Sequence, residues 1–452
     1  MNRRKENEIK GIFGLVVLVF LFFLLIPLAR LFLKSFMGDA GPTLGHYAEV
    51  LTGRGFLEAF GNSLLISSVS AVMTTALAFI LAYAVHYCNL PKGYKGFISR
   101  AAVIPMLLPT ITYGFAIIYS FGKQGLITQL FGAQLFDIYG FNGLLLGYVV
   151  YTLPVSFPLL SNTMSYVDKK FSIVSRIMGD SPFATFVRTV LRPLLGTLAA
   201  SFVQCFFLCF TDYGIPASVG GEFEVVATVL YNEMLGSVPD FCRGACVAMM
   251  MLIPSMVTIA LLHYLEKYNI RYNKISQIEI RKGVVRDTAL GVLSALILMC
   301  VLSVFAVIFV VPFVDEWPYR IQFTLEHVIS VFSDSSLVTV CRNSLVVAFL
   351  TAAVGSLTTY GAALTTARSH LPEKVKQVIE NISLITNTIP GMVIGIAYML
   401  IFSGTPLQNT LFIIIICNVI HYFSTPYLMM KSSLTKMNAS WETTAMLMGD
   451  TW

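Results

Sequence analysis

The stretch Thr43-Leu44-Gly45-His46 returns later in the chain as Thr324-Leu325-Glu326-His327. The same offset pairs further residues without a gap over roughly eighty positions, which marks a duplicated unit. The pairs are Asn62-Ser63-Leu64 with Asn343-Ser344-Leu345, Leu90-Pro91 with Leu371-Pro372, Pro109 with Pro390, Gly114 with Gly395 and Phe121 with Phe402. Because many transporters are built from duplicated apolar units around a central path, the sequence predicts a transporter with two related halves.

The composition is that of a membrane protein. Of the 452 residues, 56% are hydrophobic and only 12% are charged, too few to cover a soluble globule. A bilayer core of ~30 Å needs about 20 apolar residues of helix, and backbone groups in lipid must bond within that helix. Runs of this length lie at residues 11–36, 61–88, 101–122, 141–163, 194–211, 243–265, 287–313, 343–367, 378–403 and 409–430. The sequence therefore predicts an all-α polytopic membrane protein with about ten transmembrane helices.

The first run has a basic start, as a secretory signal peptide does. Its apolar part exceeds the usual ~7–15 residues and no small-residue cleavage pattern follows, so we interpret it as a retained first span. Basic residues stay on the cytoplasmic side, so Arg3, Arg4 and Lys5 predict a cytoplasmic N-terminus. The loop 212–240 has no Lys or Arg and is predicted to lie outside. This sidedness explains the net charge of +6, so no nucleic-acid partner is expected.

The predicted spans also divide the chain. A first repeat of about six spans covers residues 1–270, a cytoplasmic linker covers 271–286, and a second repeat of about four spans covers 287–452. An even number of spans in a complete repeat gives both halves the same orientation. The predicted fold is therefore a tandem parallel repeat of six-span units in which the second unit is incomplete.

Residues 168–195 mix charged and apolar side chains at helical spacing, which predicts short amphipathic helices. Gly179 suits a left-handed helix end and Pro182 suits the first turn of the next helix. A loop lying on lipid headgroups is the alternative interpretation. Met448-Gly449-Asp450 repeats Met178-Gly179-Asp180 near the end of the chain. Because the same helical motif occurs in both halves, we favour the interpretation that its helices project from the membrane and bind a partner protein.

With these residues in view, the chain resembles the inner-membrane permease subunits of binding-protein-dependent ABC importers. Each half in that family carries a motif of the form E-A-A-x-x-x-G-x9-I-x-L-P. Here Gly179, Leu191, Ala445 and Gly449 match it, Ile173 stands where an acidic residue is expected, and Pro193 comes one place late. The likeness is sharpest to the fused, double-length permeases of ferric-iron and phosphonate importers. It rests on Thr211-Asp212-Tyr213-Gly214, Gly220-Gly221 and Ala227-Thr228 with Tyr231.

The resemblance implies that the motif helices bind clefts in two copies of a cytoplasmic ABC ATPase subunit. The motif positions are Ile173, Ser175, Arg176, Gly179, Asp180, Leu191, Pro193, Glu442, Thr443, Ala445, Gly449 and Asp450. In the first copy, Phe171, Ile177 and Phe183 form an apolar face that suits a groove. The sequence has no G-x-x-x-x-G-K-[ST] phosphate loop, so ATP and Mg are expected on a separate chain. We expect neither an enzyme nor a resident cofactor or metal. An extracytoplasmic solute-binding protein is the other implied partner, and the resemblance implies that this chain lies in the inner membrane of a bacterium.

Six residues within or beside the spans are pathway candidates: Pro109, Pro390, Asp212, Tyr213, Asn387 and His421. A proline in mid-span kinks a helix and frees a carbonyl, and polar groups within spans are often functional. Each has a structural alternative. The prolines serve packing, Asp212 caps a turn with Tyr213, and Asn387 and His421 make interhelical hydrogen bonds.

The predicted function is the solute pathway of an ATP-driven importer. Ferric iron prefers hard oxygen ligands and suits Tyr213, Tyr231 and the acidic outer loop; phosphonates and polyamines stay open. An ATP-independent secondary transporter with two parallel halves is the alternative, although its proton relays need acidic residues that the spans nearly lack. Because the second repeat stops at Trp452, inside its motif, we also expect a truncated product, and a non-functional permease remains an alternative.

Overall fold

The computed structural model describes residues 3–38, 41–265, 283–369 and 371–438, together with residues 440, 441, 444 and 448. The chain divides into two units. Leu44–Val331 forms one, called the 44–331 unit, and Met1–Thr43 with Phe332–Trp452 forms the other, called the terminal unit.

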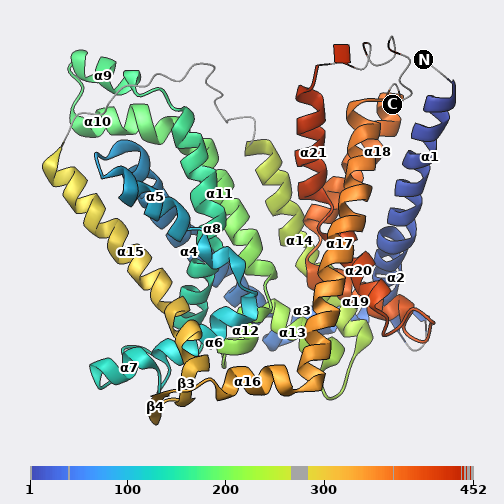
Figure 1. The fold of residues 1–452 in the computed structure, drawn as a ribbon. Helices are drawn as coiled ribbons and strands as arrows, with labels where there is room; N and C mark the ends of the chain where they lie inside the picture. The colour runs from blue at the N-terminus through green and yellow to red at the C-terminus, as the bar shows by residue number, and fades with distance from the viewer. Residues whose placement is uncertain are drawn as a thin grey trace. The chain divides into compact units, whose positions relative to one another are not determined.

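In the 44–331 unit, helices α4, α8 and α11 pack against one another as a core (Figure 1). The helices are α3 Gly45–Thr52, α4 Arg54–Tyr87, α5 Lys92–Ala101, α6 Thr110–Phe121, α7 Leu126–Phe131, α8 Phe141–Tyr166, α9 Lys170–Ile177, α10 Pro182–Phe186, α11 Arg192–Thr211, α12 Gly214–Val219, α13 Val226–Leu235, α14 Phe241–Leu265 and α15 Val284–Val310. Hydroxyl groups join the core helices: Thr74 and Thr152 lie 2.9 Å apart, and Thr75 and Ser201 lie 3.1 Å apart. Such interhelical bonds satisfy polar groups that have no water partner in lipid.

In the terminal unit, the long helix α17 packs against α1, α20 and α21 (Figure 1). The helices are α1 Arg3–Phe20, α2 Ile26–Ser35, α17 Ser335–Ala367, α18 Glu373–Thr388, α19 Gly391–Phe402, α20 Leu411–His421 and α21 Ser424–Lys436, and α16 Glu326–Ser333 crosses from one unit to the other. The rings of Phe20 and Phe423 meet edge to face at 4.5 Å. Between α1 and α2 the helix has a π-helical turn, Leu21–Leu25, and there the Phe23 carbonyl accepts a hydrogen bond from the Tyr398 hydroxyl at 2.6 Å.

Seven helices in the described residues are long and apolar enough to cross a membrane, and up to ten spans result if each bent helix pair counts as one. Helices with closed internal hydrogen bonding are the solution that lipid demands. The prediction of an all-α polytopic membrane protein is confirmed.

Three of the predicted spans are broken into two helices each. The chain bends by 107° between α5 and α6, by 102° between α18 and α19, and by 54° between α20 and α21. Pro109 and Pro390, predicted in mid-span, instead stand at the breaks as the residues before α6 and α19. A proline has no N–H to continue the helix and disfavours helical geometry in the residue before it, so the helix stops and restarts.

The two units divide the chain differently from the predicted repeats, 1–270 and 287–452. Helices α1 and α2 pack on α17 and α19 of the terminal unit. Helix α15, which follows the predicted linker, packs on α4, α5 and α6 of the 44–331 unit, where Tyr94 donates a hydrogen bond to the Gly291 carbonyl at 2.9 Å. The first helices of each predicted repeat thus pack against helices of the other predicted repeat. The sequence repeat itself stays a prediction.

The repeated stretch of sequence has the same local role in both places. Strands β1 Met37–Gly38 and β2 Gly41–Pro42 form a hairpin before Thr43, and β3 Val314–Glu316 and β4 Arg320–Phe323 form one before Thr324. Thr43 donates its N–H to Phe36 at 2.8 Å, and Thr324 donates its N–H to Phe313 at 3.0 Å. Each hairpin is therefore closed by the first residue of the repeated stretch.

Candidate functional site

The segment Asp168–Pro193, called the 168–193 segment, forms the two short helices expected from the sequence. Helix α9 ends in a turn at Gly179, whose φ of +86° lies in the left-handed region. The Gly179 amide donates to the Arg176 carbonyl at 3.0 Å and the Asp180 amide donates to the Ser175 carbonyl at 3.1 Å. This pair of bonds is the Schellman ending of a helix. Ser181 then begins α10 by accepting a hydrogen bond from the Ala184 amide at 3.2 Å.

A polar network ties the two helices together. The Ser175 hydroxyl donates to the Asp180 carboxylate at 2.6 Å and lies 3.1 Å from the Thr185 hydroxyl. The Arg188 guanidinium donates to the other carboxylate oxygen of Asp180, also at 2.6 Å. The Ser175 hydrogen bond, and after it the Arg188 charge, hold the pKa of Asp180 below its ordinary value. The carboxylate therefore stays charged at neutral pH and fixes the angle between α9 and α10.

The same segment exposes a large apolar surface. Ile177 is 80% exposed and Phe183 is 76% exposed, and Phe171, Ile173, Val174 and Met178 are exposed as well. A groove of about 600 Å³ runs beside them. Its lining residues are Phe171, Val174, Ser175, Met178, Asp180, Arg188, Thr189, Arg192 and Pro193. Apolar side chains held out on a rigid turn form a surface that fits the groove of another protein.

The other predicted motif positions have different roles. Ser175 is buried and belongs to the polar network, Arg176 contributes the carbonyl that Gly179 binds, and Leu191 ends a single π-helical turn, Val187–Leu191. For the second copy, Glu442, Thr443, Ala445, Gly449 and Asp450 lie outside the described residues, as does most of the predicted linker 271–286. The assignment of both copies to ATPase coupling stays a prediction.

Two of the pathway candidates come together in the 44–331 unit. Asp212, which follows α11, is buried and accepts a hydrogen bond from the Ile215 amide of α12 at 2.9 Å. Thr110, the residue after Pro109, also bonds this carboxylate. Asp212 thus holds the start of α12 against the start of α6. The ring of the neighbouring Tyr213 stacks on Tyr231 with centroids 4.7 Å apart.

Two more candidates come together in the terminal unit. His421 ends α20, and its Nε2 lies 3.1 Å from the point where a Cβ on Gly391 would stand. Gly391 follows Pro390 at the start of α19, as Thr110 follows Pro109 at the start of α6. The Nδ1 atom of His421 is buried and has no hydrogen-bond partner among the described residues. Asn387 lies in the last turn of α18, half-buried.

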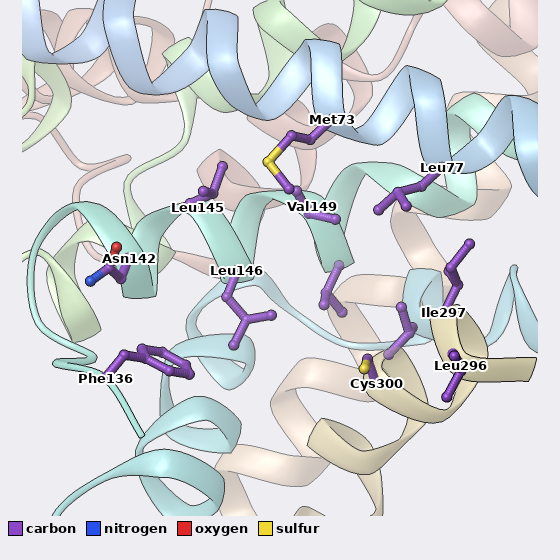
Figure 2. A pocket seen from close by; sticks show the side chains of 12 residues that line it. Met73, Leu77, Phe136, Asn142, Leu145, Leu146, Val149, Leu296, Ile297 and Cys300 are labelled. Atoms are coloured by element: carbon purple, nitrogen blue, oxygen red, sulfur yellow. The ribbon is translucent and has the colours of Figure 1, made fainter. Parts of the chain in front are cut away.

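A separate cavity of about 500 Å³ lies between α4, α8 and α15 (Figure 2). Met73 and Leu77 reach into it from α4, Leu146 and Val149 from α8, and Leu296 from α15. Asn142 and Cys300 are the polar members of its lining. Its mostly apolar walls offer few ligands to a hydrated ion.

Within the described residues, no group of three or more His, Cys, Asp or Glu side chains could hold a metal ion.

The sequence analysis missed several residues that build these sites. Thr185 and Thr189 complete the network and groove of the 168–193 segment, and Thr110 joins Asp212 across the fold. Thr185 lies ten positions after Ser175. This spacing does not by itself predict a contact, which forms only because the turn at Gly179 folds α10 back on α9. Thr110 carried one signal, its place directly after the repeated proline.

Comparisons with known proteins identify relatives. No protein-family model matches the chain. It is 24% identical over 414 residues to a putative ferric transport system permease protein of Haemophilus influenzae, covering 87% of this chain and 64% of the relative. It is 26% identical over 416 residues to a ferric transport system permease protein of Actinobacillus pleuropneumoniae, covering 87% of this chain and 59% of the relative. A thiamine transport system permease protein of Haemophilus influenzae is 25% identical, covering 80% of this chain and 66% of the relative.

The chain thus spans less than two thirds of the length of the two ferric relatives. Among solved structures, a chain of a bacterial ABC transporter that imports alginate aligns with a TM-score of 0.48 and 12% identity over 58% of this chain and 96% of its own length. The named relatives confirm the resemblance to transport-system permease proteins.

Proposed function

We propose that this chain forms the solute pathway of an ATP-driven ABC importer in the inner membrane of a bacterium and couples through the 168–193 segment to a separate ATPase subunit. The observation that carries the proposal is the rigid, exposed apolar surface around Ile177 and Phe183. Burial of such an apolar surface in the groove of another protein lowers the free energy, because it removes apolar area from water. Arg176 and Arg188 flank it and suit a polar rim.

The named relatives support ferric iron as the solute. Fe³⁺ prefers hard oxygen ligands, and the stacked pair of Tyr213 and Tyr231 stands beside the acidic residues Glu222, Glu224 and Glu233 in sequence. An extracytoplasmic binding protein would select the solute and deliver it to this side of the chain. ATP and Mg belong to the ATPase partner, and this chain performs no catalysis of its own.

The coupling part is tested by affinity purification from gently solubilised membranes of the native host, with a tag at Met1. We expect a protein with a G-x-x-x-x-G-K-[ST] loop to be retained, and we expect Phe183→Asp to reduce its retention at least tenfold. Val238→Asp is the matched control, since Val238 is 89% exposed in a loop outside the segment. Equal retention by all three chains would remove the coupling role from this segment.

The substrate part is tested separately in cells that express this chain together with the partner proteins identified by the purification. The measurement is the uptake of radiolabelled ferric citrate into these cells. Uptake is expected to depend on ATP and to be insensitive to collapse of the proton gradient. Uptake that follows the proton gradient alone would favour the ATP-independent transporter, and uptake of a phosphonate or of putrescine in place of iron would reassign the substrate.

A further inference from the structure

Two half-buried lysines lie close together at the end of the 44–331 unit that carries α9 (Figure 1). Lys95 belongs to α5, and Lys169 is the residue before α9. The Lys169 ammonium lies over the ring of Tyr87, the last residue of α4, at 5.9 Å from the ring centroid. Burial, and after it the charge of Lys95, lowers the pKa of Lys169. The two ammonium groups therefore lie near enough to repel each other.

The acidic residues of this region are bound elsewhere. Within the described residues, neither Lys95 nor Lys169 forms an ion pair with a carboxylate. Asp168 accepts a hydrogen bond from the first amide of α9 at 2.9 Å. Asp287, at the start of α15, is bound by two nitrogens of the Arg286 guanidinium at 2.7 and 2.9 Å. Because partly buried ammonium groups are ordinarily paired with anions, these two lysines suit an anion from outside the chain.

A histidine adds a third basic group to the pair. The charges of Lys169 and Lys95 both act on His86, one residue before the end of α4. The Nε2 atom of His86 lies 2.8 Å from the Ser161 hydroxyl of α8, which fixes the imidazole ring between the two helices. The lysines thus lie beside a rigid wall, formed by the end of α4, and not on a loop tip.

Exposed apolar side chains surround the two lysines. Phe97 of α5 is 50% exposed, and Val284 and Val285 at the start of α15 are 80% and 84% exposed. Helix α15 packs on α5, where the Tyr94 hydroxyl donates to the Gly291 carbonyl at 2.9 Å. The membrane-spanning part of α15 begins at Val284, which places this region at the surface of the bilayer. A soluble anion would cover only the charges, whereas a lipid also covers the apolar side chains.

We propose that Lys95 and Lys169 bind the phosphate of an anionic phospholipid headgroup, with the acyl chains against Phe97 and the start of α15. Anionic headgroups attract basic side chains at the membrane surface. Two ammonium groups that repel each other gain most from one anion between them. The proposal depends neither on the solute that crosses the membrane nor on the protein that binds the 168–193 segment.

The test is native mass spectrometry of the purified 452-residue chain in a neutral detergent, titrated with phosphatidylglycerol or with phosphatidylcholine. We expect phosphatidylglycerol to bind at least tenfold more tightly than phosphatidylcholine. The double variant Lys95→Gln with Lys169→Gln should lose at least fivefold in affinity for phosphatidylglycerol. Equal affinity in the variant and the unchanged chain overturns the proposal.

Two further double variants separate a site from general charge. Lys123→Gln with Lys436→Gln removes the same charge from two exposed lysines and should leave the affinity for phosphatidylglycerol unchanged. Lys95→Arg with Lys169→Arg keeps both charges and should retain the affinity. The melting midpoint without added lipid checks that each variant is folded. A loss in the control as large as that in the Lys95 and Lys169 variant contradicts a specific site.

Two other outcomes assign the lysines to a different ligand and also overturn the proposal. Inorganic phosphate in large excess should not displace the lipid; displacement that depends on both lysines would mean a soluble anion. The glutamine variant of Lys95 and Lys169 should still retain the ATPase subunit in the affinity purification. Loss of that subunit with unchanged affinity for phosphatidylglycerol would mean that the lysines bind a partner protein.

Discussion

Helix α12 lies in a groove between α6 and α8, whereas a groove of about 330 Å³ between α19 and α20 is open, although each stands beside a helix that restarts at a repeated proline. Gly114 is in close contact with Ser218, and its counterpart Gly395 has free space around it. The break at the proline therefore does not depend on what fills the groove. The backbone break is a local property of the sequence, and the close approach of a third helix is a property of the assembled fold.

The polar groups beside the first residues of α6 and α19 also differ. Beside Thr110, the Asp212 carboxylate accepts hydrogen bonds and holds the start of α12. Beside Gly391, the His421 ring packs on the backbone, and its Nδ1 has no partner in the described part of the chain. The polar group beside the start of α6 is satisfied, and the one beside the start of α19 is not.

The largest effect is expected from alanine at the paired glycines. Gly114→Ala would force a Cβ to within 2.1 Å of Ser218, and overpacking of this kind costs about 1–3 kcal/mol. Gly395→Ala should leave stability unchanged. The apparent melting midpoints of the two variants in detergent measure the difference. Equal destabilisation would mean that α19 is as tightly covered as α6.

Removing the polar groups of Asp212 and His421 should change the stability in opposite directions. Asp212→Ala removes the carboxylate that caps α12 and should cost about 1–2 kcal/mol, in the range of helix caps. His421→Phe keeps a ring against Gly391 and removes an unpaired buried nitrogen, so stability should be unchanged or raised by up to about 1 kcal/mol. Thermal unfolding followed by circular dichroism tests both. A loss at His421 as large as that at Asp212 would show that the imidazole has a partner after all.

A side chain at the second glycine of the filled groove should have a smaller effect. Gly147→Cys would bring its Cβ to 2.7 Å from the γ-methyl of Ile215 and 3.3 Å from the δ-methyl of Ile117. Because both side chains must shift slightly, we expect a loss of about 1 kcal/mol. Cys417→Gly in α20 should cost no more than the ~0.5–1 kcal/mol of a glycine inside a helix. The same melting experiment checks the pair, and a larger loss from Cys417→Gly would contradict the comparison.

The smallest effect is expected where a turn depends on charge and not on close packing. The pKa of Asp180 is lowered, first by Ser175 and then by Arg188. A lowered pKa in the folded state means that this carboxylate stabilises the turn above its ordinary value of 3.8 and loses the effect as pH falls through the folded value. Hydrogen exchange at the Gly179 and Asp180 amides should therefore show constant protection of the turn from pH 7 to pH 5, after correction for the intrinsic rate.

The Asp180→Asn variant is the control for that measurement. It should show weaker protection of the same amides at pH 7 and no change in protection at lower pH. A wild-type profile that already loses protection at pH 6 would place the titrating group elsewhere.

Local features of this protein follow from its sequence alone. The apolar runs predict the spans because lipid requires a helix of sufficient length at each one. Gly179 predicts the turn between α9 and α10, because a left-handed residue is needed there. The repeated prolines mark the positions of both breaks, although the sequence analysis took them for kinks in continuous spans. These features depend on a few neighbouring residues, so the chain determines them before it folds.

The tertiary structure decides which surfaces meet. Helices α1 and α2 lie with α17 and α19, and α15 lies with α4, α5 and α6, although an apolar helix looks alike on every face that lipid or protein can cover. The bond from Thr110 to Asp212 and the contact of Gly114 with Ser218 join positions about a hundred residues apart. Hydrophobic periodicity shows that one face of a helix is buried, but it does not show which neighbouring helix covers that face. Only packing in three dimensions selects the partner, and it filled one groove and left the other open.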